Sequence, residues 1–142
     1  MKQVFLDTNV FIDYLTCREG FYVPAATIVS LAEKGYFKLL VSSLSFATGS
    51  YVLESHYHKT QDEIVQGYKR FLEFSYVTKV DESTVRQAIE EPLSDFEDAM
   101  QYHSATAESA DCIITRDLKH FASSSIKIMT PQDFLKMITA LT

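Results

Sequence analysis

Short apolar segments alternate with longer segments of helical periodicity along most of this chain. The apolar segments cover residues 3–6, 37–41, 77–80, 112–115 and 126–129, and they are typical of buried strands. Strands that alternate with helices usually pair in parallel, because each crossover helix returns the chain to the same end of the sheet. The sequence therefore predicts an α/β fold, a three-layer α/β/α sandwich with a central, mostly parallel sheet.

Capping signals mark where several predicted helices begin. Thr60 with Glu63, and Ser94 with Glu97, have the spacing of a capping box, in which two side chains bond the backbone at a helix start. Asp81 can cap the helix that lies between these two. We expect the helix after Ser94 to run to about residue 109. Its expected inner stripe consists of Phe96, Met100, His103 and Ala107.

The chain has the length of one ordinary domain. Its 142 residues are 46% hydrophobic, enough for a core that needs neither a disulfide nor a structural metal. No repeat or low-complexity linker divides it, so residues 1–142 should form a single domain. Charges interrupt the longest apolar stretches, and we expect a soluble cytoplasmic protein without membrane association. Cys17 and Cys112 lie far apart and outside any zinc-type spacing, which favours two buried thiols.

Acidic residues are concentrated in one segment. Residues 81–98 contain seven acids and one base, Arg86, which accounts for the net charge of −6. The rest of the chain is balanced and has no Lys/Arg cluster of the kind that binds nucleic acid electrostatically. A modest basic and aromatic surface for stacking bases can form around residues 56–70, although a solvated helical hairpin is the simpler interpretation. Binding of nucleic acid should therefore be weak, local or mediated by a metal ion.

Three acids lie where a parallel sheet usually binds ligands, at the carboxyl ends of its strands. Asp7 follows the first predicted strand, Asp117 comes two residues after the fourth, and Asp98 lies in the first turn of the helix before that strand. Clustered carboxylates repel one another unless cations neutralise them, and oxygen ligands suit Mg²⁺ or Mn²⁺. Such ions can hydrolyse a phosphodiester by activating water. Acids at these positions also serve as helix caps, so spacing alone leaves both interpretations open.

Motifs at both ends of the chain are similar to those of a known family. The segments LDTNVFIDYL near the start, DFEDAMQYHSATAESADCIITRDLKHF near the end, and the closing strand with TPQDFL resemble the PIN domain of VapC-type toxin ribonucleases. The resemblance extends over the whole chain in order. It implies an α/β/α sandwich and an endoribonuclease that uses Mg²⁺ or Mn²⁺ to cleave RNA. It also implies a homodimer and a toxin neutralised by an antitoxin protein bound over the cleft.

The resemblance assigns roles to individual residues. The three motif acids, which are expected to be catalytic and to hold the metal, match Asp7, Asp98 and Asp117. The polar motif positions that usually support the acids or a metal-bound water match Thr8, Asn9 and Thr115. The acids implied by the resemblance are therefore the same three that the strand ends bring together.

Other residues near these motifs have roles that the sequence leaves open. Glu97 can turn toward the cleft as an auxiliary ligand, or it can simply cap its helix. Arg116 and Lys119 in the TRDLKHF segment are the best candidates for phosphate contacts. Asp13 recurs in the family phrase, but we expect it to cap a helix or lie in solvent. His103 falls on an apolar stripe, which favours a core histidine with a satisfied hydrogen bond.

The chain departs from the family motif in the helix after the second strand. The family places a Glu there, in a phrase like SSLSLAEL, whereas this chain has SSLSFATGSYVLE with Thr48 at the Glu position. Glu54 comes six residues later, which is about 240° around a helix at ~100° per residue, so it should face elsewhere. One metal ligand is therefore missing. This loss supports a second interpretation, a catalytically degenerate PIN-like module that only binds RNA or a protein.

Two other classes that use an acid after the first strand fit less well. The pattern of a phosphoacceptor receiver domain contains a pair of acids after the first strand and a Lys before a Pro after the fifth strand. This chain has one acid after the first strand, and Thr130 stands before Pro131. A haloacid-dehalogenase-like phosphatase needs a second Asp two residues after the first, where Asn9 stands. Metal dependence separates the two remaining interpretations, since a nuclease would fail in EDTA and a binding module would not.

Overall fold

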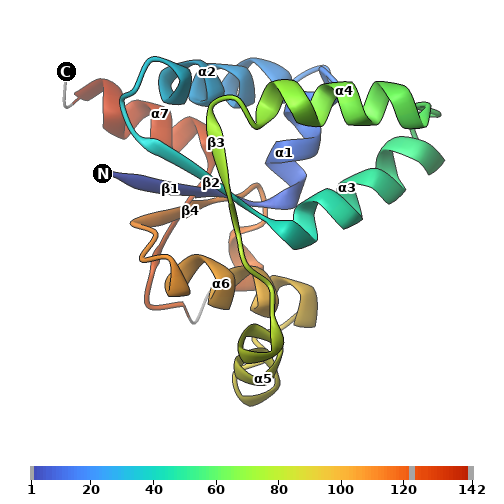
Figure 1. The fold of residues 1–142 in the computed structure, drawn as a ribbon. Coiled ribbons are helices and arrows are strands. Elements are labelled where there is room, and N and C mark those ends of the chain that lie inside the picture. The colour runs from blue at the N-terminus through green and yellow to red at the C-terminus, as the bar shows by residue number, and fades with distance from the viewer. Residues whose placement is uncertain (1, 122–123, 141–142) are drawn as a thin grey trace.

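Backbone hydrogen bonds join five strands into one sheet in the computed structural model of the protein, which describes residues 2–121 and 124–140. The strands are β1 (Gln3–Leu6), β2 (Lys38–Ser42), β3 (Ser75–Thr78), β4 (Cys112–Ile114) and β5 (Lys127–Met129). The connecting α-helices are α1 (Thr8–Leu15), α2 (Tyr22–Glu33), α3 (Ser43–Ser55), α4 (Gln61–Phe71), α5 (Glu82–Glu90), α6 (Phe96–Ala107) and α7 (Pro131–Ala140), with a 3-10 helix, η1 (Leu118–Phe121) (Figure 1).

All strand pairs are parallel, in the order β3-β2-β1-β4-β5. The chain moves outward from β1 through β2 to β3, and then crosses to the other side of β1 to form β4 and β5. This reversal creates a topological switch point between β1 and β4, where open α/β sheets usually bind ligands. The register pairs Leu6 with Ile114, so the residues that follow these two strands lie side by side.

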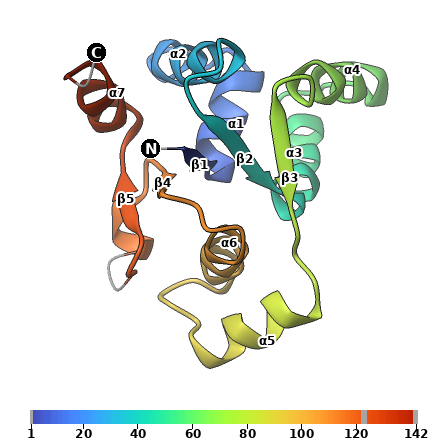
Figure 2. The same cartoon turned by 60° about the vertical axis from the view of Figure 1, so that its left-hand side comes forward.

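The sheet is covered by helices on both faces, because successive side chains of each strand point to opposite sides. Val4 and Leu39 belong to a core cluster with residues of α1, α2 and α7. Phe5 and Leu40, their neighbours in sequence, pack instead with residues of α6 and η1. Figures 1 and 2 show α1, α2 and α7 on one side of the sheet and α6 on the other, with α5 lying beyond α6. The predicted three-layer α/β/α sandwich is confirmed.

The third strand lies slightly earlier than the sequence indicates. It covers Ser75–Thr78 rather than residues 77–80, because its limits are set by backbone pairing with β2 and not by apolar content. β3 is an edge strand, and its Tyr76 and Val77 are exposed. An edge strand has only one neighbour to pair with and needs fewer buried side chains, so its sequence signal is weak.

The capping boxes are partly as predicted. Thr60 and Glu63 form one at the start of α4. The predicted box at Ser94 is wrong, because Asp95 is the cap of α6 and accepts a hydrogen bond from the backbone N of Asp98 at 3.1 Å. An Asp side chain one residue closer to the helix serves as well as Ser in this position. Glu97 is thereby left free of any capping role.

The buried face of α6 differs from the predicted stripe. Phe96 and Ala107 are exposed, whereas Ala99 and Ala105 are fully buried. Gln101 is also buried, with its amide fully hydrogen-bonded. Small and polar residues thus occupy part of the inner face. A prediction based on large apolar residues therefore assigned the wrong face of this helix to the core.

Three smaller predictions have clear outcomes. His103 is buried and its Nε2 lies 3.2 Å from the backbone O of Glu91, as expected for a core histidine. Cys112 is buried in β4, but Cys17 is exposed, so two buried thiols were predicted and one is found; both are free. No helix within residues 2–121 and 124–140 is long and apolar enough to span a bilayer.

Candidate active site

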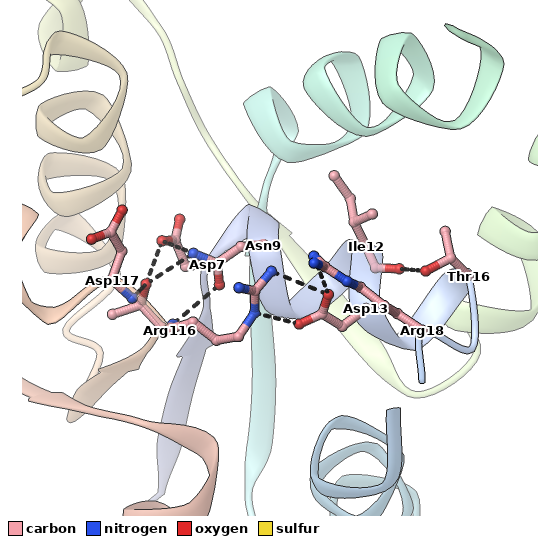
Figure 3. Close-up of polar contacts among 9 residues, drawn as sticks. Asp7, Asn9, Ile12, Asp13, Thr16, Arg18, Arg116 and Asp117 are labelled. Carbon is pink, nitrogen blue, oxygen red and sulfur yellow. Dashed lines mark hydrogen bonds and ion pairs between the residues drawn. The ribbon is translucent and has the colours of Figure 1, made fainter. Parts of the chain in front are cut away.

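Asp7 lies at the switch point, at the end of β1, and its carboxylate is enclosed by hydrogen-bond donors. The residue is only 4% exposed and caps α1, accepting from the backbone N of Thr8 at 2.9 Å. Thr115, which follows β4, donates its hydroxyl to the other carboxylate oxygen at 2.8 Å. The Asn9 amide donates to that same oxygen at 3.4 Å and to the Thr115 hydroxyl at 3.2 Å (Figure 3). The expected supporting residues Thr8, Asn9 and Thr115 therefore do surround Asp7.

Gln101 joins Asp7 to the adjacent strand β2, and sequence reasoning missed it. The Gln101 amide nitrogen lies 3.2 Å from Asp7 Oδ1 and 2.9 Å from each of the Thr8 and Ser45 hydroxyls. Its carbonyl accepts a hydrogen bond from the Ser42 hydroxyl. The signal was available, because Gln101 is three residues after Asp98 on the same helix and so shares its face.

Burial perturbs the titration of Asp7. Desolvation raises the pKa of this carboxyl above its usual range, although hydrogen bonds from Thr115, Gln101 and Thr8 oppose the shift. The nearby charge of Asp117 raises the pKa further. A cation beside Asp7 would relieve both effects.

Asp98 and Asp117 are brought together by a histidine. Asp98 lies in the first turn of α6 and Asp117 just before η1, and His120 of η1 pairs with both. Its Nδ1 is 3.0 Å from Asp117 Oδ2. Desolvation lowers the pKa of His120, but the charges of Asp98 and Asp117 outweigh it and raise the pKa overall. In this arrangement the imidazole supplies the positive partner of the two acids.

Asp98 is a second strongly perturbed acid at the candidate active site. Burial raises its pKa to about 6, and the charges of Asp7 and Asp95 add to the shift, whereas His120 opposes it. The carboxyl is thus costly to ionise while the site has no further cation. A perturbed acid at a switch point is a typical sign of a functional site.

The acids offer the right ligands for a hard divalent cation, but they do not form a ready-made metal centre. Carboxylate oxygens are the ligands that Mg²⁺ and Mn²⁺ prefer, and the repulsion between Asp7 and its two neighbours is what such an ion would relieve. In the part of the chain that the structure describes, however, no three His, Cys, Asp or Glu side chains are placed to hold a metal ion. The carboxylates are therefore of the right chemical type for the ion, but His120 pairs with two of them in this arrangement.

Glu97 turns toward the position from which the expected Glu is missing. Thr48 on α3 donates its hydroxyl to Glu97 Oε1 at 3.0 Å. Glu54, at the other end of α3, is exposed. A carboxylate is therefore present beside Thr48, although it comes from α6 rather than α3.

Asp13 corrects an expectation. It is 2% exposed rather than solvated, and it binds Arg116 through two contacts, at 2.7 Å to Nε and 3.3 Å to Nη2. Arg18 lies 3.8 Å from the same carboxylate. A carboxylate that is buried in this way needs a cationic partner, and Arg116, which directly follows Thr115, supplies it. Lys119 is exposed on η1 and keeps a free approach to solvent.

Comparisons with known proteins agree on the fold. A family model described as PIN domain matches residues 3–119. No curated protein matches the chain significantly. Among solved structures, it is similar to VapC20 from Mycobacterium tuberculosis, a sarcin-ricin loop cleaving toxin, with a TM-score of 0.67 and 15% identity over 85% of this chain and 95% of that one.

Two solved complexes are similar to the same degree. A toxin-antitoxin complex from Klebsiella pneumoniae has a TM-score of 0.64 and 20% identity, covering 90% of this chain and 97% of that one. VapBC2 from Rickettsia felis, bound to a DNA fragment from its promoter, has a TM-score of 0.62 and 18% identity, covering 89% and 96%. At these identities the likeness establishes the fold.

Proposed function

The chain belongs to the PIN domain family, and on that premise we propose that it is a metal-dependent endoribonuclease that hydrolyses RNA phosphodiesters. The observation that carries the proposal is the gathering of acids at the switch point between β1 and β4. The charge of Asp117 raises the pKa of Asp7 there, and the charge of Asp7 raises the pKa of Asp98, although a purely structural role requires no such repulsion between acids. Their repulsion is a cost that a bound cation would offset.

The proposed roles follow from the contacts of each side chain. Asp7 is held in one orientation by four donors, so it presents fixed oxygens to the cleft. Asp98 and Asp117, now paired with His120, would hold the ion together with Asp7. When bound, Mg²⁺ or Mn²⁺ would supply an activated water and neutralise charge on the phosphodiester. Glu97, beside Thr48, is the auxiliary acid of this proposal.

The remaining residues would orient these groups or the substrate. Thr8 and Thr115 fix Asp7 through hydrogen bonds, and Asn9 connects both sides of the switch point. Lys119 is exposed near the acids and is a phosphate contact in the proposal, together with Arg116. His120 would hold a proton on Nδ1 when no ion is bound, and would release its two acids when one is.

We infer further that the protein is the toxin of a toxin-antitoxin pair, acts in the cytoplasm and forms a homodimer. The similar solved structures are those of toxins and toxin-antitoxin complexes, which supports a protein antitoxin as partner. Light scattering tests the dimer: a monomer at tens of micromolar would remove that part of the proposal.

Cleavage of single-stranded RNA tests the activity. Wild type should cleave with Mn²⁺ and fail in EDTA, and Asp98→Asn should abolish cleavage, because an amide offers an oxygen without the charge that offsets a cation. Thr48→Glu should raise cleavage, since it restores the carboxylate that the family motif carries. Equal cleavage by all three proteins would mean that the activity is a contaminant and that the site is wrong.

The second candidate function is a degenerate module that binds RNA or protein without cutting. Thr48 in place of the Glu favours it, as does the pairing of Asp98 and Asp117 with His120 rather than with free ligand positions. RNA binding that is unaffected by EDTA, with no cleavage in Mn²⁺, would support this module against the nuclease.

A further inference from the structure

A second pocket lies next to the acids and has the opposite charge. It encloses about 510 Å³ and is lined by residues of α1, the end of α3 and the segment after β4, among them Asn9, Arg18, His56, Tyr57 and Arg116. The only acid that lines it is Asp13. Two guanidinium groups against one carboxylate give the pocket a net positive charge in a chain whose overall charge is −6.

Contacts within the protein orient both arginines before any ligand arrives. Asp13, which is buried, binds Arg116 at 2.7 Å and lies 3.8 Å from Arg18. Both guanidinium groups also lie over the ring of Phe21, at 4.4 Å for Arg116 and 4.7 Å for Arg18. Figure 3 shows the two side chains converging on Asp13 from opposite sides. A guanidinium held in this way loses little freedom when it binds an anion.

The pocket is connected to the acids through a single side chain. Asn9 donates its amide to Asp7 Oδ2, and its carbonyl accepts from the backbone N of Arg116 at 3.2 Å. The paired arginines and the carboxylates therefore lie on two sides of the same asparagine (Figure 3). An RNA strand bound at the acids therefore has a positively charged pocket beside it for a neighbouring backbone phosphate.

We propose that this pocket binds the RNA backbone phosphate next to the one presented to the acids, with Arg18 and Arg116 on the phosphate and Tyr57 stacked on its base. The proposal rests on the ribonuclease function above. Arg18 and Tyr57 are exposed and can reach such a ligand, and the guanidinium N–H groups that are not directed at Asp13 suit phosphate oxygens. The positive charge would also attract an acidic polypeptide. Such a ligand, however, has no base to stack on the ring of Tyr57.

RNA binding in EDTA tests the pocket without cleavage. The probe is a fluorescein-labelled oligouridylate, titrated by anisotropy at 50 to 200 mM salt. Each phosphate contact with single-stranded nucleic acid contributes about 0.7 to the slope of log K against log salt. Arg18→Gln should therefore lower the slope by about 0.7. The ratio of the RNA affinity of wild type to that of the variant should then shrink about threefold across this salt range. Arg86→Gln, a change in an exposed arginine of α5 paired with Glu82, should leave the slope unchanged.

Tyr57→Ala is the second variant. It should weaken binding about fivefold or more through lost stacking while keeping the wild-type salt slope. Tyr36→Ala removes another exposed tyrosine, which lies just before β2 and outside the pocket, and should have no effect. Thermal melts should show that Arg18→Gln is folded, since Arg116 keeps its two contacts with Asp13.

Each outcome decides something. If wild type binds and cleaves RNA while Arg18→Gln and Tyr57→Ala match their controls, the pocket proposal is wrong and the ribonuclease stands. If wild type neither binds nor cleaves, both fail. Polyglutamate in place of RNA is the further arm: loss of polyglutamate binding in Arg18→Gln with unchanged RNA binding would assign the pocket to an acidic peptide and overturn the proposal.

Discussion

Replacing Asp98 by Asn should stabilise the metal-free protein at neutral and higher pH. The folded-state pKa of Asp98 is about 6, against an ordinary value of 3.8, so the folded protein holds this proton more tightly than the unfolded chain does. The group therefore opposes folding once it ionises: its cost is absent well below pH 3.8, grows between 3.8 and about 6, and is constant above that. Asparagine carries no such cost.

The magnitude follows from the size of the pKa shift. A shift from 3.8 to about 6 corresponds to roughly 3 kcal/mol. Water reaches one side of Asp98, whose side chain is 15% exposed, and screens part of this cost, so we expect about 1–2 kcal/mol. In a His120→Gln background the gain should be larger, because the compensating cation is gone.

Urea unfolding in EDTA at pH 4 and pH 8 measures the effect. The curves of wild type and Asp98→Asn should nearly coincide at pH 4 and separate at pH 8, with the variant more stable. Asp111→Asn is a control of opposite sign, because backbone N–H groups of Lys2 and Gln3 lower the pKa of Asp111. That variant should lose stability at pH 8. An Asp98→Asn protein less stable than wild type at pH 8 would refute the reasoning.

Other changes have expected outcomes of different kinds. Gln101→Leu removes a buried amide that hydrogen-bonds the Asp7 carboxylate and the hydroxyls of Thr8, Ser42 and Ser45, and it should lower the free energy of unfolding by about 1–3 kcal/mol, which urea curves would detect. Phe11→Ala removes a fully buried ring that contacts three other aromatic rings and should cost about 3–5 kcal/mol in the same assay; a loss under 1 kcal/mol would contradict the packing. Mn²⁺ at about 100 times its Kd should raise wild-type stability by ~2.7 kcal/mol and Asp98→Asn by less, and an unchanged melting temperature would count against a metal site.

The sequence could predict those parts of the site that depend on local position. Asp7 and Thr115 follow buried strands, and in a parallel sheet that alone places them at one edge. Asp98 was found through its place in a first helical turn. Each of these predictions depends on the position of a residue within one strand or helix, and not on contacts with the rest of the chain.

Contacts between distant elements could not be predicted in this way. Asp13 and Arg116 are 103 positions apart, and no pattern on the short helix α1 says that its acid is buried against a residue after β4. The spacing from Asp98 could place Gln101 on the inner face of its helix, but it could not identify the hydrogen-bond partners of Gln101, which lie on other elements. Its partners can be identified only from the structure, in which α6 lies close to the end of β2.

The pairing of β1 with β4 also dictates when the site can exist. Asp7 and Thr115 are separated by 108 positions, and they meet only after the chain has formed three crossovers and returned to the centre of the sheet. Synthesis proceeds from the N-terminus, so a ribosome releases Asp7 long before its partners. A nascent chain that stops before residue 112 lacks β4 and with it Thr115 and Asp117. A cell that makes this protein is therefore exposed to an assembled site only once nearly the whole chain has been translated.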